Sequence, residues 1–241
     1  MNRVKPICVS LAWTIAICLT SRAESQYRVG TEAQINPTQV NRGLLTSLVE
    51  QGFTELKDGM SREATRTFEQ AKKKDPLNSL IRFGLARALQ DEDQKTRALE
   101  EYTISIFLNP NNAKPYANRA LIKGSLQDLA GALDDLETAI RIDRDLAPAY
   151  LNRGVTLAAL NKPMLALEDF NQALKINPRY ADAYRNRGIT KNFLGDLRGA
   201  CRDWKQAGSL GQAEPWAWYR QLCLVIPSTQ PSLAPRHPSQ R

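Results

Sequence analysis

The chain has 241 residues, of which 33 are lysine or arginine, 25 are aspartate or glutamate and one is histidine, so its formal net charge is +8. Hydrophobic residues make up 42% and charged residues 24%, proportions that are ordinary for a soluble protein and that exclude wholesale disorder and a polytopic membrane protein. The one histidine, His237, lies in a tail rich in proline and serine. Because Ser-His-Asp, Cys-His and histidine-based zinc sites need a histidine held in a packed shell, we expect none of them, and neither a cofactor nor a metal.

The N-terminal segment 1–23 is typical of a secretory signal peptide. Arg3 and Lys5 give it a positive start, residues 7–20 carry no charge, and Ser21-Arg22-Ala23 offers small residues at the cleavage positions. We therefore predict export to a periplasm, a lumen or the extracellular space. The alternative is a retained anchor, although spanning a bilayer takes about 20 apolar residues. Cleavage would leave 30 basic residues against 25 acidic ones, since it removes three basic residues and no acid, and nucleic acid is accordingly a poor candidate partner.

An internal repeat of 34 residues follows. The segments that begin at Ala113, Ala147 and Ala181 share a Tyr-x-Asn-Arg motif, and the same register gives five units without insertion: 45–78, 79–112, 113–146, 147–180 and 181–214. The twentieth place of every unit is alanine: Ala64, Ala98, Ala132, Ala166 and Ala200. The eighth place is always small: Gly52, Ala86, Ala120, Gly154 and Gly188. The twenty-fourth place is always large and apolar: Phe68, Tyr102, Leu136, Phe170 and Trp204.

These places are typical of two antiparallel helices in each unit. Small residues let the two helices approach closely, and the large residue fills the space between neighbouring units. The pattern resembles the tetratricopeptide repeat over residues 45–214. This resemblance implies an all-α fold, a right-handed superhelical solenoid of five 34-residue helical hairpins plus a C-terminal capping helix. Arg82 departs from the pattern, because an aromatic residue is usual at its place.

The flanking segments complete the predicted organisation. Residues 24–44 are polar and are predicted to form an N-terminal linker that is loose until about Pro37. Residues 215–226 begin with proline and are predicted to form the capping helix, which covers the last apolar face of a solenoid. Residues 227–241 contain four prolines and are predicted to be a disordered Pro/Ser-rich tail.

Two cysteines remain after removal of the signal, Cys201 and Cys223. They lie eleven residues either side of Gln212, where the chain should turn from the last repeat into the cap. They should therefore sit at about the same level of adjacent helices. We predict a disulfide that joins the cap to the last repeat, and two buried free thiols are the alternative.

Arginine and aspartate recur together in the last three units. Arginine occupies the seventh place and aspartate the twenty-third, which gives the pairs Arg119 with Asp135, Arg153 with Asp169 and Arg187 with Asp203. The first unit has neither charge at these places, and the second has Leu85 with Glu101. The pattern predicts an ion pair within each hairpin rather than a ligand site, because the aspartates already account for the arginines.

Asparagine occupies the sixth place of the same three units, at Asn118, Asn152 and Asn186. In the family that the chain resembles this place faces a concave groove, and the three amides look like the asparagine ladder of O-linked N-acetylglucosamine transferase. An amide both donates and accepts hydrogen bonds, so it can bind a peptide backbone of any sequence. The alternative is a local hydrogen bond that stabilises each hairpin. The same face should present further partner-binding residues: Lys114, Leu121, Leu151, Val155, Arg185, Ile189 and Phe193.

The sequence therefore predicts an exported protein–protein interaction scaffold or assembly factor that is not an enzyme. Its groove is expected to hold an extended or helical segment of another protein. Two alternatives remain open: a membrane-tethered structural spacer that contacts a complex through its outer surface, and a non-catalytic accessory subunit of an enzyme complex. We expect no nucleic acid as a partner, and membrane association only through an uncleaved N-terminus.

Overall fold

The computed structural model describes residues 37–224, with side chains from Gly43 onward. The predicted signal peptide (1–23), most of the predicted linker, the last two residues of the predicted capping helix and the predicted tail (227–241) lie outside the described residues. Residues 38–224 belong to one compact unit. This part of the chain is helical and contains no strand, which confirms the all-α fold class.

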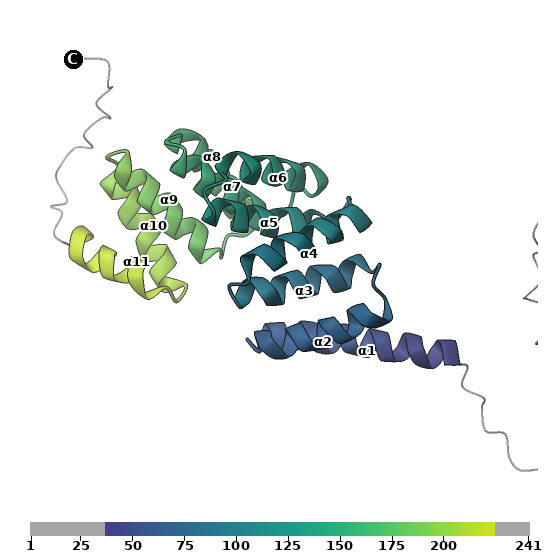
Figure 1. The fold of residues 1–241 in the computed structure, drawn as a ribbon. Coiled ribbons are helices and arrows are strands. Elements are labelled where there is room, and N and C mark those ends of the chain that lie inside the picture. Colours follow the sequence, from purple (N-terminus) through teal and green to yellow (C-terminus); the bar gives the residue numbers. More distant parts are fainter. Residues whose placement is uncertain (1–36, 225–241) are drawn as a thin grey trace, which may run out of the picture. The chain divides into compact units, whose positions relative to one another are not determined.

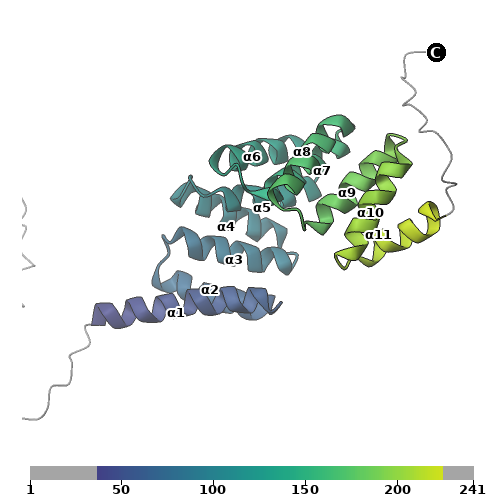
Figure 2. The ribbon, with the colours of Figure 1, turned by 180° about the vertical axis from the view of Figure 1, so that it is seen from behind.

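The helices follow one another as antiparallel pairs joined by short turns (Figures 1 and 2). The pairs are α1 (Pro37–Lys57) with α2 (Ser61–Lys74), α3 (Ser79–Asp91) with α4 (Lys95–Leu108), α5 (Ala113–Ser125) with α6 (Leu129–Ile142), α7 (Ala147–Ala159) with α8 (Pro163–Ile176) and α9 (Ala181–Phe193) with α10 (Leu197–Ser209). The short helix α11 (Ala213–Trp218) and the π-helical turn η1 (Tyr219–Cys223) follow and pack on α10. We call the odd-numbered helices α1 to α9 the first helices and the even-numbered helices α2 to α10 the second helices.

Both ends of the described chain differ from the expected boundaries. Helix α1 begins at Pro37 and so extends into the segment predicted as a linker, and proline is well tolerated in the first turn of a helix. The capping segment begins at Ala213, two residues before the expected Pro215, because Gln212 already has extended backbone and precedes the helix. It continues beyond Trp218 as a π-helical turn.

The turn within each pair contains a residue in the left-handed conformation at the same place of the 34-residue register. These residues are Gly59, Asp93, Gln127, Asn161 and Gly195, and their φ angles range from 57° to 85°. Glycine adopts this conformation without the steric cost that other residues incur. The backbone shape therefore recurs in all five turns although the residue varies.

Close contact between a small residue and a large one sets the distance between helices. A Cβ atom added to Gly154 on α7 would lie 2.6 Å from the Phe170 ring on α8. At Gly188 on α9 it would lie 2.6 Å from Nε1 of Trp204 on α10. The small eighth place and the large twenty-fourth place therefore form one packing unit, as the repeat pattern predicts.

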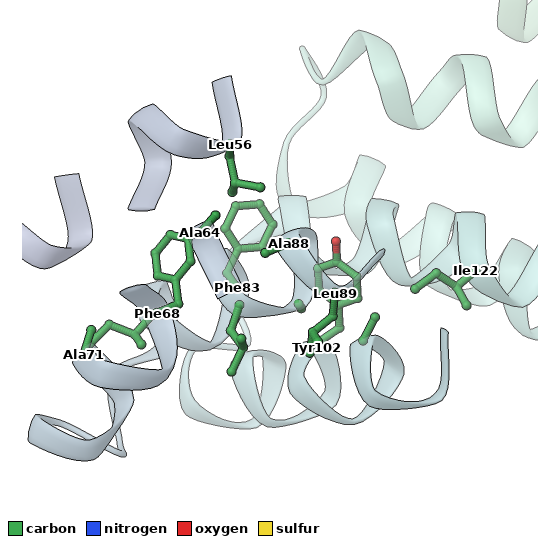
Figure 3. Close-up of a cluster of buried hydrophobic side chains, with 13 residues drawn as sticks. Leu56, Ala64, Phe68, Ala71, Phe83, Ala88, Leu89, Tyr102 and Ile122 are labelled. Carbon is green, nitrogen blue, oxygen red and sulfur yellow. The ribbon is translucent and has the colours of Figure 1, made fainter. Parts of the chain in front are cut away.

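Buried side chains form three clusters along the stack. The first joins α1 through α5 and contains Phe68 and Tyr102, both fully buried (Figure 3). The rings of Phe53 and Phe68 meet edge to face with their centroids 5.1 Å apart. The Tyr102 hydroxyl donates a hydrogen bond to Gln90 Oε1 at 2.8 Å, and burial raises the pKa of this tyrosine. The second and third clusters surround Leu136 and Phe170.

Candidate functional site

The first helices form one side of the stack. Helix α3 contacts α5, α5 contacts α7 and α7 contacts α9, whereas in the described part of the chain no comparable contact joins the second helices. Helices that approach one another more closely lie on the inner side of a curved stack. The side chains that α5, α7 and α9 expose are therefore the candidate site.

An apolar stripe runs along this side. It consists of Leu121, Val155 and Ile189, which occupy the ninth place of successive units and are 43%, 43% and 42% exposed. Phe193 continues it at the end of α9 and is 70% exposed. Exposed apolar residues that line up in this way mark binding surfaces more often than scattered ones do. Of the predicted partner-binding residues, these four are the exposed apolar side chains of the first helices.

Leu151 does not belong to this surface. It is only 7% exposed and packs in the third buried cluster with Phe170 and Ala183. In the second, third and fourth units, each of which another hairpin follows, the fifth place is covered: Phe83 and Ala117 are buried there, as Leu151 is. Leu151 therefore holds the helices together and is not available to a partner.

The three asparagines are half-buried on the first helices, but their hydrogen bonds differ. The Asn118 side chain interacts with the Tyr102 hydroxyl of the preceding unit and lowers the pKa of that tyrosine against the effect of burial. The Asn186 amide donates to the carbonyl of Asp182, one turn earlier in α9, at 2.8 Å. For the Asn152 side chain, no hydrogen bond is found among the described residues. The three amides thus do not share one local structural role, and the Asn152 amide, on the middle helix α7, keeps its bonding capacity.

The remaining two predicted site residues are charged. Lys114 is exposed at the start of α5. Arg185 lies on α9, and its Nη1 atom is 3.3 Å from Oε2 of Glu214 on α11. Basic groups therefore lie on the first and on the last of the three helices that carry the stripe.

The repeated arginines are structural, as predicted. Each donates two hydrogen bonds to its aspartate; for Arg153 and Asp169 they measure 2.8 and 2.7 Å. The guanidinium also lies over the ring of Tyr150, 5.7 Å from its centroid, and the hydrogen bond to Asp169 raises the pKa of Arg153. The same arrangement recurs in Arg119 with Asp135 and in Arg187 with Asp203. The Nε and Nη2 donors of each arginine are used within its own hairpin, and Nη1 of Arg119 and of Arg187 bonds to Thr103 and Asn171 of the preceding hairpin. These arginines therefore hold the stack together rather than bind a ligand.

The second unit keeps this ion pair in a different form, which the sequence analysis missed. Glu101 stands at the aspartate place, and Arg82 Nη1 lies 2.8 Å from its Oε2 atom. Lys72 from the preceding unit reaches Oε1 at 3.0 Å. Arg82 is three residues before the usual arginine place, on the same face of the helix, so helical spacing was the signal that could have revealed the pair.

The capping segment is bonded to the last hairpin. Cys201 on α10 and Cys223 at the end of η1 form a disulfide. The rings of Trp204 and Trp218 meet edge to face with centroids 5.6 Å apart, and Pro215 of α11 is fully buried. The apolar face at the end of α10 is therefore covered.

Residues 37–224 hold neither a cluster of metal ligands nor a membrane-spanning helix. Within this range no group of three or more His, Cys, Asp or Glu residues is placed to hold a metal ion. No helix there combines the length and the apolar composition needed to cross a membrane.

An all-α stack of helical hairpins with an apolar stripe along its first helices is the architecture of a helical-repeat scaffold. The sequence profile of the tetratricopeptide repeat matches residues 113–146 and 147–180, the third and fourth predicted units. Residues 113–180 of this chain are therefore two tetratricopeptide repeats.

One curated relative and several solved structures are similar to parts of the chain. RNA polymerase II-associated protein 3 of Xenopus tropicalis is 31% identical over 93 residues, which are 39% of this chain and 14% of that protein. The chain thus spans about a seventh of the length of that relative.

Among solved structures, PilF of Pseudomonas aeruginosa has a TM-score of 0.65 at 18% identity, covering 72% of this chain and 79% of its own. A thermophilic tetratricopeptide-repeat protein of Thermus thermophilus has a TM-score of 0.65 at 21% identity, with 73% and 97% covered. PilW, a type IV pilus biogenesis factor, has a TM-score of 0.63 at 23% identity, with 69% and 77% covered. These likenesses show the solenoid fold, and together with the repeat they support a role as a protein-interaction scaffold.

Proposed function

We propose that this chain is exported and that the face of α5, α7 and α9 binds a polypeptide segment of another protein, so that the chain acts as a scaffold or assembly factor. The observation that supports this is the apolar stripe. Leu121, Val155 and Ile189 are each more than two fifths exposed, on helices whose other apolar side chains are mostly buried. Covering them removes apolar surface from water, which contributes about 25 cal/mol for each Å² buried.

The partner segment must be long enough to cross three successive helices. An extended strand or a helix meets this condition, since either places apolar side chains at regular intervals along one face. The Asn152 amide beside the stripe offers a donor and an acceptor to the backbone of such a segment. Length and apolar spacing, more than one particular sequence, would then determine which segments bind.

Export is supported by two features. Segment 1–23 has the charge distribution and cleavage residues of a signal peptide. The Cys201–Cys223 disulfide is a bond that persists in oxidising compartments and is rare in reducing ones. Fractionation of cells that express the full chain, with mass spectrometry of its N-terminal peptide, tests both export and cleavage. Recovery of the intact N-terminus in the cytosolic fraction would contradict this part of the proposal.

The binding face is tested with paired charge substitutions. The double variant Val155→Asp and Ile189→Asp puts two carboxylates into the stripe without altering a buried residue. The matched control is Phe107→Asp with Met164→Asp, which changes residues that are 83% and 63% exposed on the second helices α4 and α8. Each variant is crosslinked in its native compartment, and captured proteins are identified by mass spectrometry.

Partners lost by the stripe variant and kept by the control would support the proposal. The reverse pattern would favour the structural spacer that contacts a complex through its second helices. Alanine at Asn118, Asn152 and Asn186 together adds a second test of the same face. Groove binding should weaken in that variant, whereas tethering should not change.

A further inference from the structure

Arg185 is a charged residue at a place of the repeat where the other units have an apolar one. It occupies the fifth place of the last unit, where the other units have Val49, Phe83, Ala117 and Leu151. Three of those four apolar residues are less than a tenth exposed. A guanidinium at a place that otherwise packs the core indicates a role other than packing, because burying a charge costs free energy unless it is well paired.

The Arg185 guanidinium makes few hydrogen bonds for the number of N–H donors that it carries. Its only ion-pair partner in residues 37–224 is Glu214, at 3.3 Å through a single nitrogen, and the Glu214 side chain is 69% exposed. Its Nε atom is buried and has no hydrogen-bond partner among the described residues. Arg187, two residues further along α9, contrasts with it, because two of its nitrogens bond to Asp203 at 2.9 and 2.6 Å.

The partner of Arg185 comes from the capping segment, and Gln212, the residue directly before that segment, also reaches α9. Besides the Glu214 contact, Gln212 Nε2 donates to Asp182 Oδ1 at 2.6 Å, while Gln212 Oε1 is buried without a partner among the described residues. Two orphaned polar atoms thus belong to the same junction between α9 and the cap. An exposed ion pair of this kind contributes little to stability, so its carboxylate is readily exchanged for another.

Arg185 is aligned with the apolar stripe. Ile189 follows it by four residues and Phe193 by eight, so all three project from one face of α9. A partner segment lying on Val155, Ile189 and Phe193 therefore passes beside the guanidinium. Complementary charge at that point would set the register of the segment.

We propose that Arg185 binds a side-chain carboxylate of the partner segment and that Glu214 holds this position in the free protein. The inference rests on the proposed function and adds the chemistry of the partner: an apolar stretch with an aspartate or glutamate beside it. The forked guanidinium pairs with a carboxylate through two parallel bonds, which Glu214 does not provide. Glu214 is then a weak internal competitor that the partner displaces.

The test selects ligands for the full chain from a phage-displayed library of random dodecapeptides. One selected peptide is synthesised with its acidic residue and again with the matching amide, Asp→Asn or Glu→Gln. Both peptides are titrated against wild type, Arg185→Gln and Glu214→Gln. Arg202→Gln and Glu168→Gln are the charge-matched controls, since both residues are exposed on the second helices. Circular dichroism checks that each variant is folded.

Wild type should prefer the acidic peptide by about tenfold, the size of one charge-assisted hydrogen bond, and Arg185→Gln should abolish that preference. Glu214→Gln should bind the acidic peptide about threefold tighter and leave the amide peptide unchanged. Equal binding of the two peptides to wild type would overturn the inference, as would weaker binding by Glu214→Gln, the result expected of a mere tether.

Different results would contradict the proposed binding face and the proposed role of Arg185. If the selected peptides bind equally well to the stripe variant Val155→Asp with Ile189→Asp, or if no peptide is selected, the binding face itself is contradicted. Loss of binding in the stripe variant together with equal binding of the acidic and amide peptides contradicts only the role of Arg185.

Discussion

Arg153 and Asp169 are joined by two parallel hydrogen bonds, from Nε and Nη2 of the arginine to the two carboxylate oxygens, at 2.8 and 2.7 Å. The pair connects α7 with α8, and Asp169 is only 5% exposed. The Tyr150 ring lies against the guanidinium on the same helix. Each of the last three units thus has the same hydrogen-bonded clamp between its two helices.

Asp169→Ala should therefore destabilise the chain by about 2–3 kcal/mol, because it leaves a half-buried guanidinium without its acceptor. Arg153→Lys should cost less, about 1 kcal/mol, since an ammonium keeps the charge but makes only one of the two bonds. Denaturant unfolding followed by circular dichroism measures both. Arg144→Gln, an exposed change in the turn after α6, is the control and should have little effect. A cost for Asp169→Ala no larger than that of the control would show that the clamp is not structural.

In the second unit we predict that the pair has moved to Arg82 and Glu101. A double-mutant cycle with Arg82→Leu and Glu101→Gln should give a coupling free energy of about 1 kcal/mol, because both side chains are largely buried. The same cycle on Arg97 and Glu69, which are more exposed, should give less than about 0.5 kcal/mol. Equal coupling in the two cycles would mean that Arg82 does not replace the missing arginine.

The repeat pattern was enough to predict the helical hairpins and the arginine clamps, because both depend on residues at fixed places of a 34-residue register. The repeat pattern did not predict the role of Arg82. Residues three or four apart share one face of a helix, so an arginine can make the same ion pair from a different place of the register. The prediction that Leu151 binds a partner was wrong for a related reason. At the fifth place, Phe83, Leu151 and Arg185 sit in one register, yet the first two are buried and Arg185 is half-buried, and only packing against the next unit decides this.

Gly154 and Phe170 should be energetically coupled. Gly154→Ala places a Cβ atom within 2.6 Å of the ring and should cost about 1–3 kcal/mol through overpacking. Phe170→Leu in the same chain should recover part of that loss, because the third unit already combines Ala120 with Leu136 at these places. Gly124→Ala is the matched control: no atom lies within 4 Å of its added Cβ, so it should be neutral or stabilising. Purely additive effects of Gly154→Ala and Phe170→Leu in thermal unfolding would contradict the coupling.

Gln127 occupies a turn position that suits glycine. Its φ angle is 65°, and the equivalent residues of the first and last hairpins are Gly59 and Gly195. Gln127→Gly should stabilise the chain by about 0.5–1 kcal/mol, because removal of the side chain relieves left-handed strain by more than it raises the entropy of the unfolded state. Gly195→Gln should cost a similar amount. The midpoint of denaturant unfolding reports both shifts, and a lower midpoint for Gln127→Gly would refute the argument.

Reduction of the Cys201–Cys223 bond should release the capping segment before the rest of the stack unfolds. The bond spans 22 residues, a separation at which loop-closure entropy corresponds to about 3 kcal/mol. The contacts that remain after reduction include the Trp204–Trp218 edge contact, Lys205 over the Tyr219 ring, buried Pro215 and the Arg185–Glu214 pair, and all of them lie at this end of the stack. Hydrogen exchange with and without dithiothreitol should therefore show lost protection in α11 and α10, while α5 and α6 are unchanged. Cys201→Ser with Cys223→Ser should reproduce the reduced pattern without the reagent. Uniform loss of protection along the chain would instead mean that the cap and the inner hairpins unfold as one cooperative unit, which the nearest-neighbour contacts of a helical solenoid do not favour.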